Sequence, residues 1–480
     1  MARTSRLCGI FTVCSALGCA EPTIAGEVAT DAATATSGTG TTGSDSPTGP
    51  GTSSDDDSTS AGATSTPTTG AETGTGTTGE VIDEAFLFDE AVLRTYEIDV
   101  APADWAWLGE NALLEQYVPA TLHFEGEVVD QAAVRYKGSV GSLKLCFDGM
   151  GNLICDKLSI KLSFDEYDEE GRFYGLKTLN FHAMEKDRTR MREAIGYKLF
   201  RDLGVAAPRT AYARMVVNGE LIGLFAVIEQ IDGRFTRERF PDGGEGNLYK
   251  EVWPVHATEQ PYLDALETNK NEAPSADRIV RFADALAQAG DAGFAAVVEA
   301  WIGADYLMRY MAVARLVDSW DDIVAWYCVQ DQPCTNHNYY WYESTAEDRV
   351  WLIAWDLDHS FEEPSPVRTN YGMPDWDAVD ADCTPIDIFL GIQGRAPACD
   401  DFIRRMATQL WDRYVEESQA LLAGDFSVAA LNARIDALTA IVDEAVAEDP
   451  NGITVAQWQA AVEELRATVV AKRNHVAAKL

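Results

Sequence analysis

An amide and two carboxylates stand at the ends of two apolar segments that are near neighbours in the sequence. Asn338 opens the aromatic run 337–342, and Asp356 and Asp358 close the run that begins at Val350. In an extended chain the i, i+2 spacing of the aspartates points both side chains the same way, so their oxygens could meet one hard cation such as Mg²⁺. A site that neutralises the charge of a phosphate group during its transfer requires ligands that hold such a cation. The competing interpretation is that Asp356 and Asp358 only cap a strand end or the following turn.

The two apolar runs are expected to pair as a β-hairpin, because the stretch 343–349 between them is polar and turn-prone. Further upstream, a strand at 128–136 includes Arg135 and leads into a loop with Gly138 and Ser139. A loop rich in glycine and serine can turn its amides toward a phosphate. A plain β-turn explains the same composition.

A lysine on a strand offers a second phosphate contact. In the segment 157–164, lysine and serine alternate with Leu, Ile and Phe, which predicts a half-buried strand. Lys161 could reach a nucleotide phosphate from there, as a lysine on a strand after a glycine loop does in kinases. The period of 186–203 predicts a helix that carries Arg192 near its start and ends at Gly204. Cations in a first helical turn fit poorly unless anions lie nearby.

The elements that must position these residues divide into a β-rich first half and a helical second half. Asn218-Gly219 favours a type I′ turn, so 211–217 and 221–231 form the clearest hairpin, which ends near Glu229. Other strands are expected at 96–100, 118–124 and 178–182. Apolar residues spaced three and four apart predict helices at 277–288, 291–301, 304–317, 401–422, 428–447 and 455–480. The fold class is therefore α+β.

The composition is that of a large globular protein with a strong acidic excess. The 480 residues are 46% hydrophobic and carry a formal charge of −39. No nucleic acid partner is expected, because phosphate backbones demand clustered lysine and arginine. Two arginines, an apolar run at 7–17 and small residues before Cys19 predict a secretory signal peptide at 1–19. The small residues before Cys19 resemble the lipobox of bacterial lipoproteins, which implies a membrane-anchoring lipid on this cysteine; simple secretion is the alternative.

Between this leader and the folded body lies a stretch without aromatic residues. Residues 20–82 are mostly Thr, Gly, Ser, Ala, Asp and Pro, a composition typical of a flexible linker, so the folded body is placed at 83–480. The six cysteines of that body fall in local couples, namely Cys146 with Cys155, Cys328 with Cys334, and Cys383 with Cys399. An even number in an exported chain predicts disulfides. A zinc site is a poorer interpretation, because no CxxC repeat is present.

Several motifs together carry a family resemblance. They are Arg-Tyr-Lys-Gly at 135–138, the strand with Lys161, the helix with Arg192, the Asn-Gly-Glu hairpin with Val-Ile-Glu-Gln-Ile-Asp at 227–232, Asn-Leu-Tyr-Lys at 247–250, His-Asn-Tyr-Tyr-Trp-Tyr at 337–342 and Trp-Asp-Leu-Asp at 355–358. From about Phe88 to the C-terminus the chain resembles the CotH family, the spore-coat-protein-H-like atypical protein kinases. The resemblance implies an atypical protein-kinase-like fold. Its antiparallel β-rich lobe would span about 83–255, and its mostly helical lobe with the catalytic hairpin about 256–480.

The resemblance also implies roles for individual residues. Asp358 and Asn338 match metal ligands, with Asp356 beside them, and Lys161 matches the phosphate lysine. Asp321 matches the catalytic carboxylate. The remaining nucleotide contacts would be Arg135, Gly138, Ser139, Arg192 and Glu229, the last where the chain passes the adenine.

One departure from the family pattern concerns the catalytic aspartate. It ordinarily lies a few residues before the asparagine, whereas here an insertion with Cys328 and Cys334 separates Asp321 from Asn338. The neighbouring aspartates therefore remain alternatives, namely Asp318, Asp322 and Asp331. A disulfide would fold the insertion into a stub and keep the strand register.

The expected function is transfer of phosphate from Mg-ATP to serine or threonine of surface proteins or of the protein itself. The cofactors would be ATP and Mg²⁺, the partner a protein substrate rich in Ser or Thr, and the location the cell envelope, at an outer membrane or cell surface. An inactive surface-binding or adhesion protein on the same fold is the alternative. A metal-dependent hydrolase using Asp356, Asp358 and His359 is less suited, because no second histidine-containing ligand set accompanies them.

Overall fold

The computed structural model describes residues 84–480 apart from 139–141, 271, 273, 330–331, 363–375, 377–382 and 390–391. The predicted signal peptide, the linker and Cys19 lie outside the described residues, and so do Ser139 and Asp331. The described residues, from Glu84 to Leu480 with these gaps, belong to one compact unit. Within the described ranges, no helix has both the length and the apolar character that a membrane span requires.

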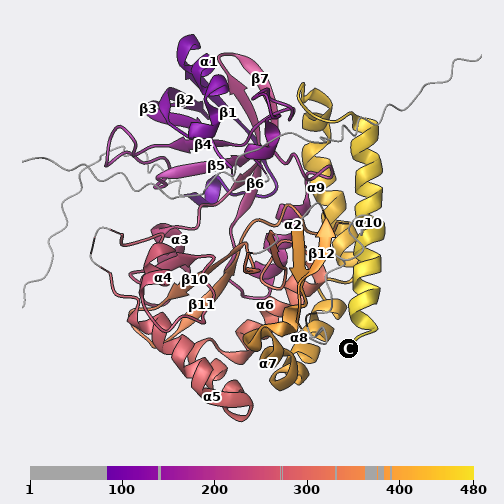
Figure 1. Ribbon diagram of the computed structural model, residues 1–480. Helices are drawn as coiled ribbons and strands as arrows, with labels where there is room; N and C mark the ends of the chain where they lie inside the picture. Colours follow the sequence, from indigo (N-terminus) through magenta and orange to yellow (C-terminus); the bar gives the residue numbers. More distant parts are fainter. Residues whose placement is uncertain are drawn as a thin grey trace, which may run out of the picture. The chain divides into compact units, whose positions relative to one another are not determined.

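The first half of the body is a closed β-barrel (Figure 1). Its strands are β1 (Leu93–Val100), β2 (Val118–Phe124), β3 (Glu127–Tyr136), β4 (Ile160–Ser163), β5 (Thr178–His182), β6 (Thr210–Val217) and β7 (Glu220–Ile228). They close in the order β1-β2-β3-β4-β5-β7-β6, antiparallel throughout except where β1 pairs with β6 in parallel. Aromatic rings fill the interior: Tyr96 lies 4.5 Å from Phe124 and 5.0 Å from Phe181. The predicted antiparallel β-rich lobe is thus confirmed.

Two smaller sheets belong to the second half. One has the order β11-β10-β8, built from β8 (Asn247–Lys250), β10 (Tyr339–Glu343) and β11 (Val350–Ala354). The other has the order β12-β13-β9, built from β9 (Trp326–Val329), β12 (Ile386–Phe389) and β13 (Ile392–Arg395). The aromatic β10 is buried along its whole length, so it reads as a central strand.

The helices complete the α+β architecture. In the barrel half and at its exit they are α1 (Pro102–Glu110), α2 (Arg192–Asp202), α3 (Gly233–Arg239) and α4 (Gln260–Asp264), followed by α5 (Asp277–Trp301), α6 (Ala304–Val317), α7 (Asp401–Gln409), α8 (Trp411–Ala423), α9 (Val428–Glu448) and α10 (Val455–Ala477). Short 3₁₀ turns are η1 (Glu84–Phe86), η2 (Ala112–Leu114), η3 (Lys144–Cys146) and η4 (Pro397–Cys399). Figure 1 shows α9 and α10 side by side, and α9 packs against β7 of the barrel.

Local sequence signals account for most element boundaries. Asn218 and Gly219 both have positive φ, as the predicted type I′ turn requires, and α6 spans the predicted 304–317. Gly290 interrupts α5 where the sequence predicted two helices. All three predicted disulfides are present, Cys146–Cys155, Cys328–Cys334 and Cys383–Cys399.

The start of α2 is a correction to the sequence prediction. The helix begins at Arg192 and not at Lys186, because Asp187 organises the preceding loop: its carboxylate accepts from the amides of Thr189 at 2.8 Å and Arg192 at 2.8 Å. Arg190 has φ 64°, which a right-handed helix cannot contain. Arg188 and Arg190 lie at the start of the predicted helix 186–203 but outside the observed α2. Their positive charges therefore do not oppose the dipole of this helix.

Candidate active site

The predicted hairpin brings Asn338 beside the acidic turn. Tyr339 pairs with Ala354 in the register of β10 and β11, and the next pair out is joined by the Trp355 amide, which donates to the Asn338 carbonyl at 3.2 Å. Asn338 has φ 61° and Asp356 φ 53°, left-handed conformations that Asn and Asp adopt more readily than most residues. The turn around Asp356 is therefore not extended. The prediction that an extended chain makes the two side chains point the same way is wrong.

Helix α2 holds the acidic turn in place. The Asp356 amide donates to the Tyr197 hydroxyl at 2.9 Å, and the Arg192 guanidinium donates to the Asp358 carbonyl at 3.1 Å. Gly196 permits this close approach, since a Cβ there would lie 2.8 Å from Leu357 Cδ1. The backbone on both sides of Leu357 is thus tied to one rigid helix.

The two carboxylates lie in an environment that opposes their ionisation. Burial, and after it the charge of Asp358, raise the pKa of Asp356 to about 8. Burial also raises the pKa of Asp358 to about 6, against the nearby His359. A divalent cation would reverse both effects, because it favours the ionised carboxylates. The donor chemistry of Asp356 and Asp358 therefore fits a hard cation.

The remaining metal ligands would have to come from other groups. Among the described residues, no group of three or more His, Cys, Asp and Glu side chains is arranged to hold a metal ion by itself. Asn338 uses its amide nitrogen to donate to the Asp321 carbonyl at 2.9 Å, which leaves its amide oxygen as the ligand atom. The site fits a cation shared with phosphate oxygens better than one held by protein alone.

Lys161 lies on β4, opposite Arg135 of β3. Its side chain reaches the segment that follows β7. Its ammonium donates to the Gln230 side-chain oxygen at 3.1 Å, which also accepts from Asn180 at 3.0 Å. Burial, and then the charge of Arg135, lower the pKa of Lys161. Gln230 rather than Glu229 is thus the residue beside this lysine.

A second lysine, which the sequence reasoning did not single out, stands between Lys161 and the acidic turn. Lys137 Nζ lies 2.9 Å from His182 Nε2, and His182 Nδ1 lies 3.0 Å from a Glu193 oxygen. An ammonium has no acceptor, so Nε2 accepts from Lys137 and the ring proton sits on Nδ1, which donates to Glu193. Burial lowers the pKa of His182 to about 3, consistent with a neutral ring.

Electrostatics place Lys137 among the predicted site residues. Burial, and then the charge of Lys161, lower its pKa to about 8, while Asp356 and Glu193 oppose this. Lys137 Nζ also lies 5.8 Å from the Trp355 ring centroid, next to the acidic turn. The Lys161 strand and the Asp356 turn therefore meet around Lys137. Its position in Arg-Tyr-Lys-Gly was the only sequence signal for it.

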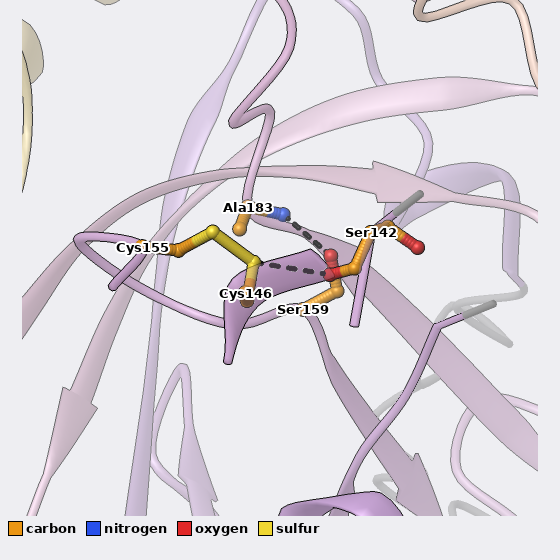
Figure 2. Close-up of a disulfide and its surroundings, with 5 residues drawn as sticks. All are labelled: Ser142, Cys146, Cys155, Ser159 and Ala183. Carbon is orange, nitrogen blue, oxygen red and sulfur yellow. Dashed lines mark hydrogen bonds between the residues drawn. A yellow bond between two sulfur atoms is a disulfide. The ribbon is translucent and has the colours of Figure 1, made fainter. Parts of the chain in front are cut away.

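The described residues on either side of 139–141 have defined contacts. Arg135 forms an ion pair with Glu115, and Gly138 has φ 150°, a conformation that L side chains rarely adopt. Figure 2 shows the Cys146–Cys155 disulfide beside Ser142, whose carbonyl oxygen lies 3.6 Å from Cys146 Sγ. In the same view the Ala183 amide donates to Ser159 Oγ at 3.0 Å.

Two predicted nucleotide contacts have other partners. The buried Glu229 carboxylate accepts from Arg209 at 2.6 Å and from Arg239 at 2.5 Å, so it is neutralised within the protein. Arg192 binds the Asp358 carbonyl and the Glu362 carboxylate, at 3.1 and 3.2 Å. Arg192 thus supports the acidic turn.

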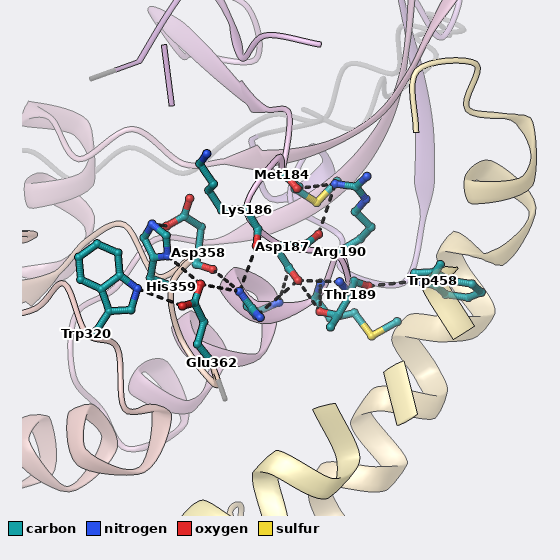
Figure 3. Close-up of polar contacts among 12 residues, drawn as sticks. Met184, Lys186, Asp187, Thr189, Arg190, Trp320, Asp358, His359, Glu362 and Trp458 are labelled. Atoms are coloured by element: carbon teal, nitrogen blue, oxygen red, sulfur yellow. Dashed lines mark hydrogen bonds and ion pairs between the residues drawn. The ribbon is translucent and has the colours of Figure 1, made fainter. Parts of the chain in front are cut away.

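The acidic turn continues into a polar network. Figure 3 shows Glu362 between Trp320 and His359, which donate to it at 3.1 and 2.8 Å. The same view shows Trp458 of α10 donating to the Thr189 carbonyl at 3.0 Å. The loop before α2 is thereby tied to the C-terminal helix.

Geometry separates the candidate catalytic aspartates. Asp318 forms ion pairs with Arg315 and Lys472, and Asp322 is buried with Val324 and Arg315 as partners. Asp321 instead accepts from the Tyr327 hydroxyl at 2.8 Å, and its carbonyl is the partner of Asn338. Asp321 is thus joined directly to a predicted metal ligand.

The chain was compared with known proteins. A model described as CotH kinase protein matches residues 134–476, well over half of the chain. The inner spore coat protein H of Bacillus subtilis strain 168 is 22% identical over 283 residues, which cover 56% of this chain and 69% of that protein. The crystal structure of the Helicobacter pylori proinflammatory kinase CtkA aligns with 75% of this chain and 92% of that chain at 8% identity, with a TM-score of 0.20. By the extent of the family match, this chain belongs to the CotH kinase protein family.

Proposed function

We propose that the protein is a CotH-like kinase that transfers phosphate from Mg-ATP to serine or threonine hydroxyls of surface proteins or of itself. The observation that carries this proposal is the meeting of cations and carboxylates around Lys137. Lys137 Nζ lies 2.9 Å from His182, whose other ring nitrogen lies 3.0 Å from a Glu193 oxygen, and 5.8 Å from the Trp355 ring centroid beside the acidic turn. Burial, and then the charge of Lys161, lower the pKa of Lys137, while Asp356 and Glu193 oppose this. Phosphoryl transfer is mostly positioning and electrostatic stabilisation, and this combination supplies both signs of charge.

Each residue of the site has a role in this reaction. Lys137 and Lys161 attract the phosphates, and Asp356, Asp358 and the Asn338 amide oxygen would hold Mg²⁺. When bound, Mg²⁺ neutralises phosphate charge as the bond to the leaving group breaks. Asp321 orients the acceptor hydroxyl and takes its proton.

The position and the charge of Lys137 are set by its neighbours. Glu193 lies on α2 and His182 on β5, so the chain from Glu193 through His182 to Lys137 links helix and barrel. Helix α2 also holds Asp356 through Tyr197. One helix therefore positions both the cationic and the anionic side of the site.

The setting would be the cell envelope. Three disulfides are consistent with an oxidising compartment outside the cytoplasm. A leader that ends at a lipid-bearing Cys19, and a linker at 20–82 that is rich in Thr and Ser, would hold the kinase at a membrane and offer it acceptor hydroxyls.

The test is phosphotransfer by the full chain with Mg-ATP, measured on the protein itself and on a serine-rich peptide. Wild type is expected to transfer phosphate, and Asp358→Ala to lose the activity. Asp425→Ala is the matched control, because Asp425 is an exposed aspartate between α8 and α9.

Calorimetry with Mg-ATP provides the second measurement. Nucleotide binding that requires Mg²⁺ is expected for wild type. Absence of both binding and transfer would reject the kinase and favour the surface-binding protein on the same fold.

A further inference from the structure

The insertion between Asp321 and Asn338 folds back onto the site. Its described residues include β9, and Tyr327 and Thr335 exchange two backbone hydrogen bonds at 3.1 Å each. The Cys328–Cys334 disulfide closes this loop, and β9 pairs with β13 with Tyr327 opposite Gly394. The described part of the insertion, which we call the ribbon, is therefore held in a sheet by β9 and the Tyr327–Thr335 bridge.

This ribbon presents one polar atom to the candidate catalytic residue. The Tyr327 hydroxyl donates to Asp321 Oδ1 at 2.8 Å. The Tyr327 ring is itself packed, with its centroid 4.6 Å from that of His337 and 6.2 Å from that of Trp320. The direction of the hydroxyl is thus set by both the strand pairing and the ring contacts.

The backbone of Asp321 is held separately from its carboxylate. Its amide donates to Ser319 Oγ at 3.3 Å, and its carbonyl accepts from the Asn338 amide at 2.9 Å. These bonds place the backbone but leave the side chain able to rotate. Among its hydrogen bonds to described residues, the one from Tyr327 is the one that fixes the carboxylate.

We propose that Tyr327 is a positioning residue for phosphoryl transfer, acting through Asp321. This inference rests on the proposed kinase function. With Oδ1 occupied by Tyr327, the other carboxylate oxygen is turned toward the acceptor hydroxyl. In the step, the acceptor oxygen forms a bond to the γ-phosphorus, the bond from that phosphorus to the ADP oxygen breaks, and the acceptor proton passes to Asp321. Tyr327 keeps its own proton throughout.

The experiment compares Tyr327→Phe with Tyr306→Phe in the full chain. Tyr306 is the matched control, because its hydroxyl also donates a hydrogen bond, at 2.9 Å, but to the backbone carbonyl of Leu352 and to no candidate site residue. Tyr327→Phe is expected to lower kcat roughly 10- to 100-fold, the effect of losing a hydrogen bond to a charged group. The KM for Mg-ATP and the melting temperature should match those of the control. In an Asp321→Asn background, Tyr327→Phe should cause no further loss.

Each other outcome overturns the inference. An unchanged kcat in Tyr327→Phe means that the hydroxyl positions nothing. A fall in kcat together with a raised KM or a melting temperature below that of Tyr306→Phe means a structural role only. If wild type binds Mg-ATP and transfers phosphate while Tyr327→Phe equals it, the kinase proposal stands and this inference alone fails. If wild type transfers no phosphate, the kinase proposal fails and takes this inference with it.

Discussion

Lysines of the barrel meet aspartates of the C-terminal half at two places, with opposite outcomes. At the first, Lys157 Nζ lies 2.5 Å from Asp449 Oδ2, and the two side chains are 2% and 3% exposed. The partners are satisfied further, since Lys157 donates to the Leu224 carbonyl at 2.6 Å and the Leu224 amide donates to Asp449 at 3.1 Å. This pair joins the barrel to the connection between α9 and α10.

At the second place the charges approach without pairing. Lys137 and Lys161 bond to neutral groups, His182 and Gln230. No ion pair in the described part of the chain joins either lysine to Asp356 or Asp358, whose pKa values burial raises. Asp358 has His359 within 3.9 Å, but neither lysine is its partner. Breaking a buried ion pair is costly to the fold, whereas buried ionisable groups of opposite sign that approach without pairing point to a ligand. The same residue types therefore serve structure at Lys157 and chemistry at Lys137.

Breaking the structural pair should have the largest effect. Lys157→Met leaves the Asp449 carboxylate buried without its counter-charge, which is expected to lower the free energy of unfolding by about 3–5 kcal/mol. Urea denaturation measures this. The double variant Lys157→Met/Asp449→Leu is the control, and it should recover most of the loss. A single variant as stable as wild type would contradict the assignment of this pair to structure.

Removing one carboxylate of the acidic turn should lower activity without lowering stability, the reverse of the effect of Lys157→Met. Asp356→Asn is expected to reduce phosphotransfer by about 10²- to 10³-fold. Its stability without metal should equal or exceed that of wild type, because the change removes a group whose ionised form burial disfavours. Kinetics and thermal unfolding of the same preparation measure both. A stability loss as large as that of Lys157→Met would erase the distinction.

Glu229 tests the comparison at a residue for which the sequence predicted a nucleotide contact. Glu229→Gln weakens the bonds to Arg209 and Arg239 and is expected to cost about 1–3 kcal/mol of stability. The affinity for Mg-ATP should not change, as calorimetry can show. A clear drop in affinity at unchanged stability would return Glu229 to the binding site.

The smallest effect concerns pH. The folded pKa of Lys137 is lowered to about 8, so the ammonium that attracts phosphate is lost as pH rises through that value. Mg-ATP affinity of wild type should therefore fall by up to about 10-fold between pH 7 and 9, one pH unit above the pKa. Lys137→Arg keeps its charge and should remove this fall. An equal fall in Lys137→Arg would assign it to another group.

For Lys137, a rise in pH has opposite effects on Mg-ATP affinity and on stability. Its unfolded pKa is near 10.5 and its folded pKa is lower, so the unfolded state binds more protons between the two values. The free energy of unfolding should rise with pH in that window. Lys137→Arg should show a smaller rise, because Lys161, whose pKa burial also lowers, still contributes to it.

Local signals were enough for much of the fold and for part of the site. Asn218-Gly219 specified its turn through the positive φ that Asn and Gly tolerate, and the alternation in β2 and β3 specified their strands. The aromatic hairpin followed from two apolar runs around a polar turn, which placed Asn338 beside Asp356 and Asp358. The disulfides followed from couples that are close in sequence.

Other features depended on individual side-chain contacts, which backbone preferences and apolar periodicity do not specify. Asp187 ended the predicted extension of α2, Arg209 and Arg239 neutralised Glu229, and Tyr327 reached Asp321. The chain Lys137–His182–Glu193 exists only because β3, β5 and α2 are brought together.

The sequence alone determined which segments become strands, turns and helices, because backbone preferences and apolar periodicity act over a few residues. Which charges are paired and which are left for a ligand was decided only by the tertiary structure. Burial and Coulomb interactions depend on distances through space, and those are set when the barrel closes and α2, the acidic turn and α9 pack against it.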